Sequence, residues 1–63
     1  MEKEIEKEIK RCEELFVFYE EIPEGFFGAS MIKQSIRDAK MAIEKHDTGD
    51  MKKVLANLKG IEG

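Results

Sequence analysis

The sequence predicts an all-α protein, arranged as an antiparallel helical hairpin with a short third helix. Apolar residues recur at alternating intervals of four and three in both halves of the chain, which is the spacing of one face of an α-helix. The composition, 40% charged and 41% hydrophobic with a single proline, favours helix over strand or disorder. Alternation with a period of two does not continue on either side of the apolar run at residues 15–19, so we expect no strand there.

The length bounds the domain organisation and the means of stabilisation. We expect the 63 residues to form one domain, residues 1–63, whose core contributes only roughly 3–5 kcal/mol. The single cysteine excludes an intrachain disulfide, and one His with one Cys falls short of a tetrahedral zinc set. We therefore expect no metal and no cofactor, and we predict that self-association supplies the missing stability.

The first helix is predicted over residues 2–21. Pairs of opposite charge one turn apart, such as Glu6 with Lys10, support it. Ile22 precedes Pro23, and a residue before proline avoids the α region, so the helix is expected to end there. Its seam consists of Ile5, Ile9, Cys12, Phe16 and Tyr19.

A turn is predicted over residues 22–29 and a second helix over residues 30–46. The start of this helix has two alternatives. Ser30 could be its N-cap, or Pro23 could be its first residue, with Gly25 and Gly28 tolerated inside. Its seam repeats the spacing of the first and consists of Ile32, Ile36, Ala39 and Ile43.

The third helix is predicted over residues 48–60, with Asp47 or Thr48 as its N-cap. At about 18 Å it is little more than half the length of its neighbours. Its apolar positions are Met51, Val54, Leu55, Leu58 and Ile61.

Complementary charges favour one register for the hairpin. The first 25 residues hold nine Glu against four Lys or Arg, whereas the remainder holds seven Lys or Arg against five Asp or Glu. In an antiparallel pair of helices, Glu13 then lies opposite Lys40 and Glu20 opposite Lys33. Each exposed pair adds only about 0–1 kcal/mol, but the pattern helps to select the register.

Apolar side chains outside the two seams predict an interface. Contiguous apolar patches on a soluble monomer usually mark an interaction site, and the short third helix can cover only part of this surface. Two or more copies that assemble into a helical-bundle homo-oligomer would cover the rest, with Val17 and Phe18 as the expected anchors. The predicted interface residues are Leu15, Val17, Phe18, Ile22, Phe26, Phe27, Met31 and Met41.

Three cations at i, i+4 and i+7, Lys33, Arg37 and Lys40, suggest an alternative function. Such a stripe can bind the phosphate of a nucleotide or another small anion, in pockets formed at oligomer interfaces. Nucleic acid is not an expected partner, because the net charge is −3 and glutamates already face two of these cations. We do not expect an enzyme, because adjacent glutamates diverge by about 100° around a helix and no catalytic constellation is present.

Together these features predict a small self-associating helical protein that binds another macromolecule, most concretely as a compact inhibitor or adaptor of a larger protein. By analogy at the level of class, stand-alone helical chains of this size are common in phages and mobile elements. The charged first ten residues lack a signal-peptide pattern, and no apolar run approaches 18 residues. We therefore expect a cytoplasmic protein with no membrane partner.

Overall fold

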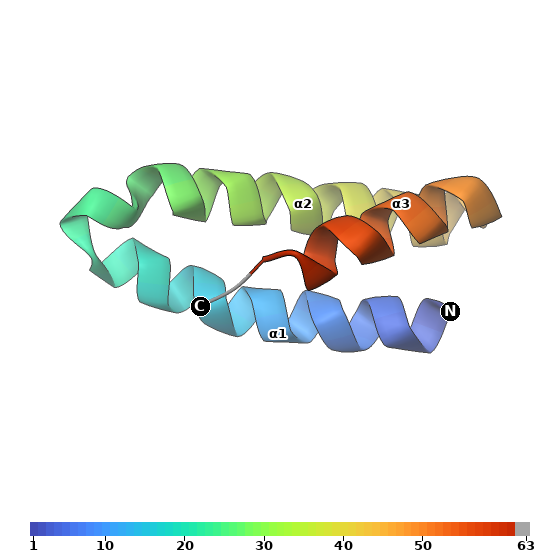
Figure 1. The fold of residues 1–63 in the computed structure, drawn as a ribbon, viewed down its shortest axis with the longest axis horizontal. Helices are drawn as coiled ribbons and strands as arrows, with labels where there is room; N and C mark the ends of the chain where they lie inside the picture. Colours follow the sequence, from blue (N-terminus) through green and yellow to red (C-terminus); the bar gives the residue numbers. More distant parts are fainter. Residues whose placement is uncertain (62–63) are drawn as a thin grey trace.

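The computed structural model describes residues 1–61, which contain three α-helices and no strand (Figure 1). The predicted all-α class is thereby confirmed. The helices are α1 (Glu2–Glu21), α2 (Phe26–Lys45) and α3 (Thr48–Lys59), and a single 3₁₀ turn, η1 (Pro23–Gly25), lies between α1 and α2. No helix of the described residues combines the length and the apolar character that crossing a membrane requires.

The three helices lie along the 36 Å length of the molecule (Figure 1). α1 and α2 run side by side in opposite directions and are joined through η1 at one end, which we call the turn end. α3 starts at the opposite end, the open end, packs against both neighbours and stops part of the way back (Figure 1). Only α1 and α2 therefore reach the turn end.

The core forms along the seams. Ile5 and Cys12 of α1 and Leu58 of α3 are fully buried. Small residues on α2 let α1 and α3 approach it closely. Ser35 on α2 is buried as well, and its hydroxyl accepts a hydrogen bond of 3.0 Å from the side-chain amide of Asn57 on α3. Within residues 1–61, every buried side-chain nitrogen or oxygen has a hydrogen-bond partner.

The turn between α1 and α2 is shorter than the sequence predicted. Ile22 is extended, as expected before proline, and the Gly25 N–H closes the 3₁₀ turn on the Ile22 carbonyl at 2.9 Å. α2 then begins at Phe26, rather than at Ser30 or Pro23. Gly25 makes the tight reversal feasible, because a Cβ there would overlap the backbone carbonyl of Tyr19.

The connection between α2 and α3 is compact. His46 ends α2 in the left-handed region, with φ 55° and ψ 31°, and its N–H donates to the Ile43 carbonyl at 3.1 Å. Asp47, rather than Thr48, is the N-cap of α3, because its Oδ1 accepts a hydrogen bond of 3.1 Å from the Asp50 N–H. Two residues thus reverse the chain.

Candidate binding surfaces

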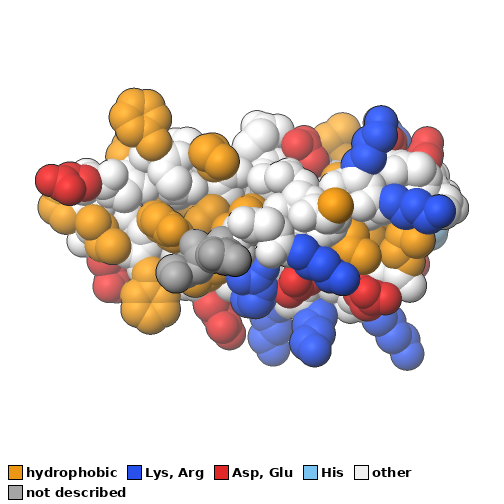
Figure 2. Space-filling model, in the orientation of Figure 1, with side chains coloured by type: hydrophobic (Ala, Val, Ile, Leu, Met, Phe, Trp, Pro, Cys, Tyr) orange, Lys and Arg blue, Asp and Glu red, His pale blue; other side chains and the backbone are white. Residues whose placement is uncertain are grey.

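Exposed apolar side chains gather towards the turn end, whereas lysines and arginines lie mainly in the other half (Figure 2). Phe18, Phe26, Phe27 and Met31 are 66%, 70%, 82% and 68% exposed. The rings of Phe26 and Phe27 touch edge to face, with centroids 5.9 Å apart.

The other predicted interface residues differ in exposure and place. Val17 and Ile22 are also exposed, and Leu15 is half-buried. Met41 is exposed but lies about 15 Å further along α2 than Met31.

The contacts of α3 divide this surface into two sides. Arg11 of α1 donates hydrogen bonds to α3-end carbonyls, so its side of α1 is the α3 side. Phe18 is seven residues further along and lies on that side. Glu13 and Glu20 lie on the side of α1 away from α3, where they share a hollow with Lys33 of α2. Val17 follows Glu13 by four residues and precedes Glu20 by three, so it lies on that side as well. The two anchors expected for one interface therefore face different surroundings.

The turn-end groove lies on the α3 side. A hollow of about 390 Å³ is lined by Leu15, Phe18 and Tyr19 of α1 and by Ile22, which follows α1. An adjoining hollow of about 200 Å³ shares Tyr19 and is bounded by Gly28, Met31 and Ile32 of α2 and by Gly60 and Ile61. We use the name turn-end groove for these two hollows together. The groove is there because α3 has 12 residues while each neighbour has 20.

Gly28 shapes this groove. A Cβ at Gly28 would lie 2.9 Å from Cδ1 of the Tyr19 ring, so the missing side chain lets the ring approach α2 closely. The sequence marked Gly28 only as a residue tolerated inside a helix. Its role depends on Tyr19, which is nine residues away, and local patterns carry no signal for such a contact.

The α1–α2 groove lies on the side away from α3. Its hollow, of about 370 Å³, is lined by Glu13, Phe16 and Glu20 of α1 and by Lys33 and Ile36 of α2. Lys40 Nζ lies 3.8 Å from Glu13 Oε2, which confirms this predicted pairing. Both side chains are more than half exposed, so the ion pair is worth little in free energy. Within the described structure Glu20 and Lys33 share the hollow without forming an ion pair.

The three cations of the predicted anion site lie together. Lys33, Arg37 and Lys40 line a shallow hollow of about 310 Å³ with Ile36, Met41 and Glu44. The carboxylate of Glu44 adds negative charge at this hollow, and Glu13 pairs with Lys40 across α1 and α2. Both features reduce the attraction of the stripe for an anion.

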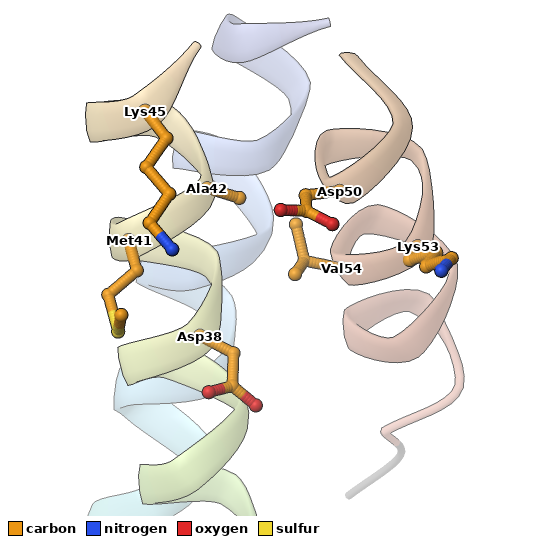
Figure 3. A pocket seen from close by; sticks show the side chains of 7 residues that line it. All are labelled: Asp38, Met41, Ala42, Lys45, Asp50, Lys53 and Val54. Carbon is orange, nitrogen blue, oxygen red and sulfur yellow. The ribbon is translucent and has the colours of Figure 1, made fainter. Parts of the chain in front are cut away.

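A further hollow, which the sequence did not predict, lies between α2 and α3 near the open end (Figure 3). Its volume is about 270 Å³, and its lining residues are Asp38, Met41, Ala42, Lys45, Asp50, Lys53 and Val54. The carboxylates of Asp38 and Asp50 face the space between the helices, whereas Lys53 lies on the outer side of α3 (Figure 3). Two acids and two lysines balance in charge. Residues 1–61 contain no group of three or more His, Cys, Asp or Glu that could hold a metal ion.

Cys12 is the one thiol of the chain, and its setting is structural. Its Sγ lies 3.9 Å from the Leu58 carbonyl in the core. Burial raises the pKa of the Cys12 thiol, the Arg11 guanidinium partly opposes this, and Glu8 raises the pKa further. A buried thiol with a raised pKa is a poor nucleophile.

Comparisons with models of protein families, with curated proteins and with solved structures found no match to this chain.

Proposed function

We propose that this protein is a small, non-enzymatic binding protein that self-associates and acts by occupying the surface of another macromolecule, as a compact inhibitor or adaptor does. The observation that carries the proposal is the exposed apolar surface at the turn end. With about 200 Å² for a whole phenylalanine side chain, Phe18, Phe26 and Phe27 expose roughly 400 Å² between them. Phe18 lies on the α3 side and Phe26 on the side away from α3, so this area is divided between two surfaces, each smaller than the roughly 800 Å² that each partner contributes to a standard interface.

The α1–α2 groove is the surface through which copies pair. Glu13 and Glu20 line its α1 side and Lys33 lines its α2 side, next to Lys40. Two copies can lie groove to groove with their turn ends together. The acidic row of each α1 then faces the basic row of the partner's α2. In the reversed arrangement the acidic rows face each other, which costs free energy. Charge therefore favours a four-helix bundle with both turns at the same end and α3 outside.

This arrangement also covers apolar surface that a single copy exposes. Phe16 lies in the groove, and Val17 is on the same side of α1. Phe26 precedes Lys33 by seven residues, which is two turns, so it lies on the same side of α2. Phe16 supplies an apolar centre between the charged rows, Val17 lies next to the acidic row, and Phe26 lies in line with the basic row. Such a centre with a polar rim is the common anatomy of interfaces.

Analytical ultracentrifugation at micromolar concentration tests the self-association. We expect an assembly for the unmodified chain, and a species near 7.3 kDa would contradict the proposal. The double variant Lys33→Glu with Lys40→Glu should dissociate the assembly, because both rows are then acidic. Adding Glu13→Lys with Glu20→Lys should restore it, because the acidic and basic rows have then exchanged places and attract each other again. Circular dichroism checks that each variant remains helical.

Adjacent residues provide a matched pair of variants. Val17→Asp should dissociate the assembly, because it places a charge next to the apolar centre. Phe18→Asp, one residue along, should leave the assembly intact, because Phe18 lies on the α3 side. The opposite result would move the self-association surface to the turn-end groove.

The second candidate function is the binding of a small anionic ligand. The observation in its favour is that Lys33, Arg37 and Lys40 line one hollow. Isothermal titration calorimetry with ATP, and separately with inorganic phosphate, tests it. Binding that Arg37→Ala abolishes would support this function. Heats equal to those of dilution would exclude it for these two ligands.

A further inference from the structure

We propose that the turn-end groove binds one basic amphipathic helix of another protein. This inference rests on the proposed function, since it names the class of macromolecule that the protein binds. It concerns a different surface from the one through which copies pair. It follows from the shape of the groove, its lining and its charge.

The shape of the groove is that of a missing stretch of helix. α3 packs against both α1 and α2 in the open half of the molecule and ends at Lys59. Beyond this point α1 and α2 continue side by side to the turn end, and none of the described residues forms a third helix over them (Figure 1). The stretch of α1 from Leu15 to Ile22 adds about 12 Å, or two helical turns. A helix that continues the direction of α3 is therefore the occupant of matching shape.

The lining is apolar and adaptable. Leu15 and Phe18, three residues apart on α1, face the groove together with Ile22, which directly follows α1. Met31 lies across from them on α2 and is 68% exposed. Methionine side chains adjust to irregular partners, and grooves of this kind accept apolar side chains from one face of a helix.

The charge around the groove is negative. Between Arg11 and Lys33 the sequence contains five glutamates and no lysine or arginine. Glu13 and Glu20 face the α1–α2 groove. Glu14 and Glu21 lie one turn before and one turn after Phe18. Outside residues 12–32, the described chain holds eleven Lys or Arg against eight Asp or Glu. The negative charge is thus concentrated in the half of the molecule that carries the groove.

This charge selects among the occupants of an apolar groove. A helix with lysines or arginines beside its apolar face would complement Glu14 and Glu21. A second copy placed groove to groove would bring the two sets of glutamates together, and an anionic membrane surface would be repelled in the same way. A basic helix fits best on both shape and charge.

The experiment uses fluorescein-labelled 18-residue peptides and fluorescence anisotropy with the full chain. The first peptide carries leucines on one helical face and lysines elsewhere, the second has glutamates in place of the lysines, and the third has the leucines and lysines in scrambled order. We expect the leucine–lysine amphipathic peptide to bind at least tenfold more tightly than either control. Equal binding of the lysine and glutamate peptides, or of the ordered and scrambled lysine peptides, would overturn the proposal.

Variants of the chain locate the binding site. Phe18→Ser and Met31→Ser should each weaken binding of the amphipathic lysine peptide at least fivefold, whereas Val17→Ser should not. Glu14→Gln with Glu21→Gln should weaken binding and flatten its dependence on salt. If Val17→Ser weakens binding as much as Phe18→Ser does, the peptide occupies another surface and the proposal is wrong.

Two further measurements separate this inference from the proposed function. Ultracentrifugation of Phe18→Ser should give the same assembly as the unmodified chain. If the variant is instead monomeric, a second copy occupies the groove. Vesicles containing anionic lipid should not bind the protein, and binding that Phe18→Ser abolishes would assign the groove to a membrane. If the unmodified chain assembles but does not bind the amphipathic lysine peptide, this inference alone is refuted, whereas a monomeric unmodified chain refutes only the self-association.

Discussion

At the scale of single residues, Cys12 illustrates how burial decides chemistry. The sequence placed it on a helical seam, where a small apolar side chain is expected. The structure buries it completely, beside the Leu58 carbonyl. The nearby Arg11 guanidinium would favour a thiolate, but the loss of solvation dominates and the pKa is raised. Cys12 therefore stabilises the neutral core rather than providing a reactive group.

The raised pKa of Cys12 predicts a dependence of stability on pH. Above the ordinary cysteine pKa of about 8.5, the unfolded chain releases the thiol proton while the folded chain retains it. Rising pH then favours unfolding, so the contribution is present below the ordinary pKa and is lost above it. Urea unfolding between about pH 7 and pH 10 should show a steeper loss of stability for the unmodified chain than for Cys12→Ala. Parallel curves for the two proteins would contradict the prediction.

At the scale of the elements, the turn between α1 and α2 depends on close backbone approach. Gly25 closes η1 and lies against the carbonyl of Tyr19, and Gly28 lies against the ring of the same residue. Tyr19 thus contacts two glycines that belong to different elements. These contacts fix where α1 ends and where α2 begins.

Gly25→Ala should therefore destabilise the protein. The new methyl group would overlap the Tyr19 carbonyl, so the turn must open, at a cost of about 1–3 kcal/mol. Ser30→Ala is a matched control, because Ser30 is exposed on α2 and alanine has a higher helix propensity there. Thermal unfolding followed by circular dichroism should show a lower midpoint for Gly25→Ala and an equal or higher one for Ser30→Ala. An unchanged midpoint for Gly25→Ala would mean that the turn adapts without strain.

At the scale of the whole molecule, Arg11 joins the first helix to the last. Its Nη2 donates to the Leu58 carbonyl at 2.8 Å and its Nη1 to the Ile61 carbonyl at 2.9 Å. Glu8 Oε2 accepts a hydrogen bond of 2.9 Å from Nε of the same guanidinium. The Leu58 carbonyl lies in the last turn of α3, where a helix lacks its own α-helical donors, and the Ile61 carbonyl lies just after the helix. A side chain of α1 therefore completes the end of α3.

Removing this link should loosen α3 more than the other helices. Arg11→Met keeps much of the side-chain length but removes the donors, at a cost of about 1.5–3 kcal/mol. Amide hydrogen exchange should accelerate in α3 while the centre of α2 stays protected. Lys10→Met, whose lysine is exposed, is the control and should leave exchange in α3 unchanged. Uniform acceleration in all three helices would show that α3 opens only when the whole domain unfolds.

Local sequence patterns predicted the helical class and the Glu13–Lys40 pairing, because both depend on spacing along the chain. They did not predict the start of α2 at Phe26. The sequence left this start open between Pro23 and Ser30, and the contacts of Gly25 and Gly28 with Tyr19 exist only in the folded chain. The separation of Val17 from Phe18 into two surfaces was missed for a similar reason, since it depends on where α3 packs. The hollow between Asp38 and Asp50 likewise requires two helices to meet.

The place of Tyr19 in the turn-end groove also makes the protein its own optical sensor. The chain has one tyrosine and no tryptophan, so excitation at the tyrosine absorption band, where phenylalanine does not absorb, gives emission from this single ring in the groove. A partner that covers the groove changes the polarity around the ring and the access of a collisional quencher such as iodide. Occupancy can therefore be followed without a label, with any partner that lacks tyrosine and tryptophan, while pairing through the opposite face leaves this signal unchanged.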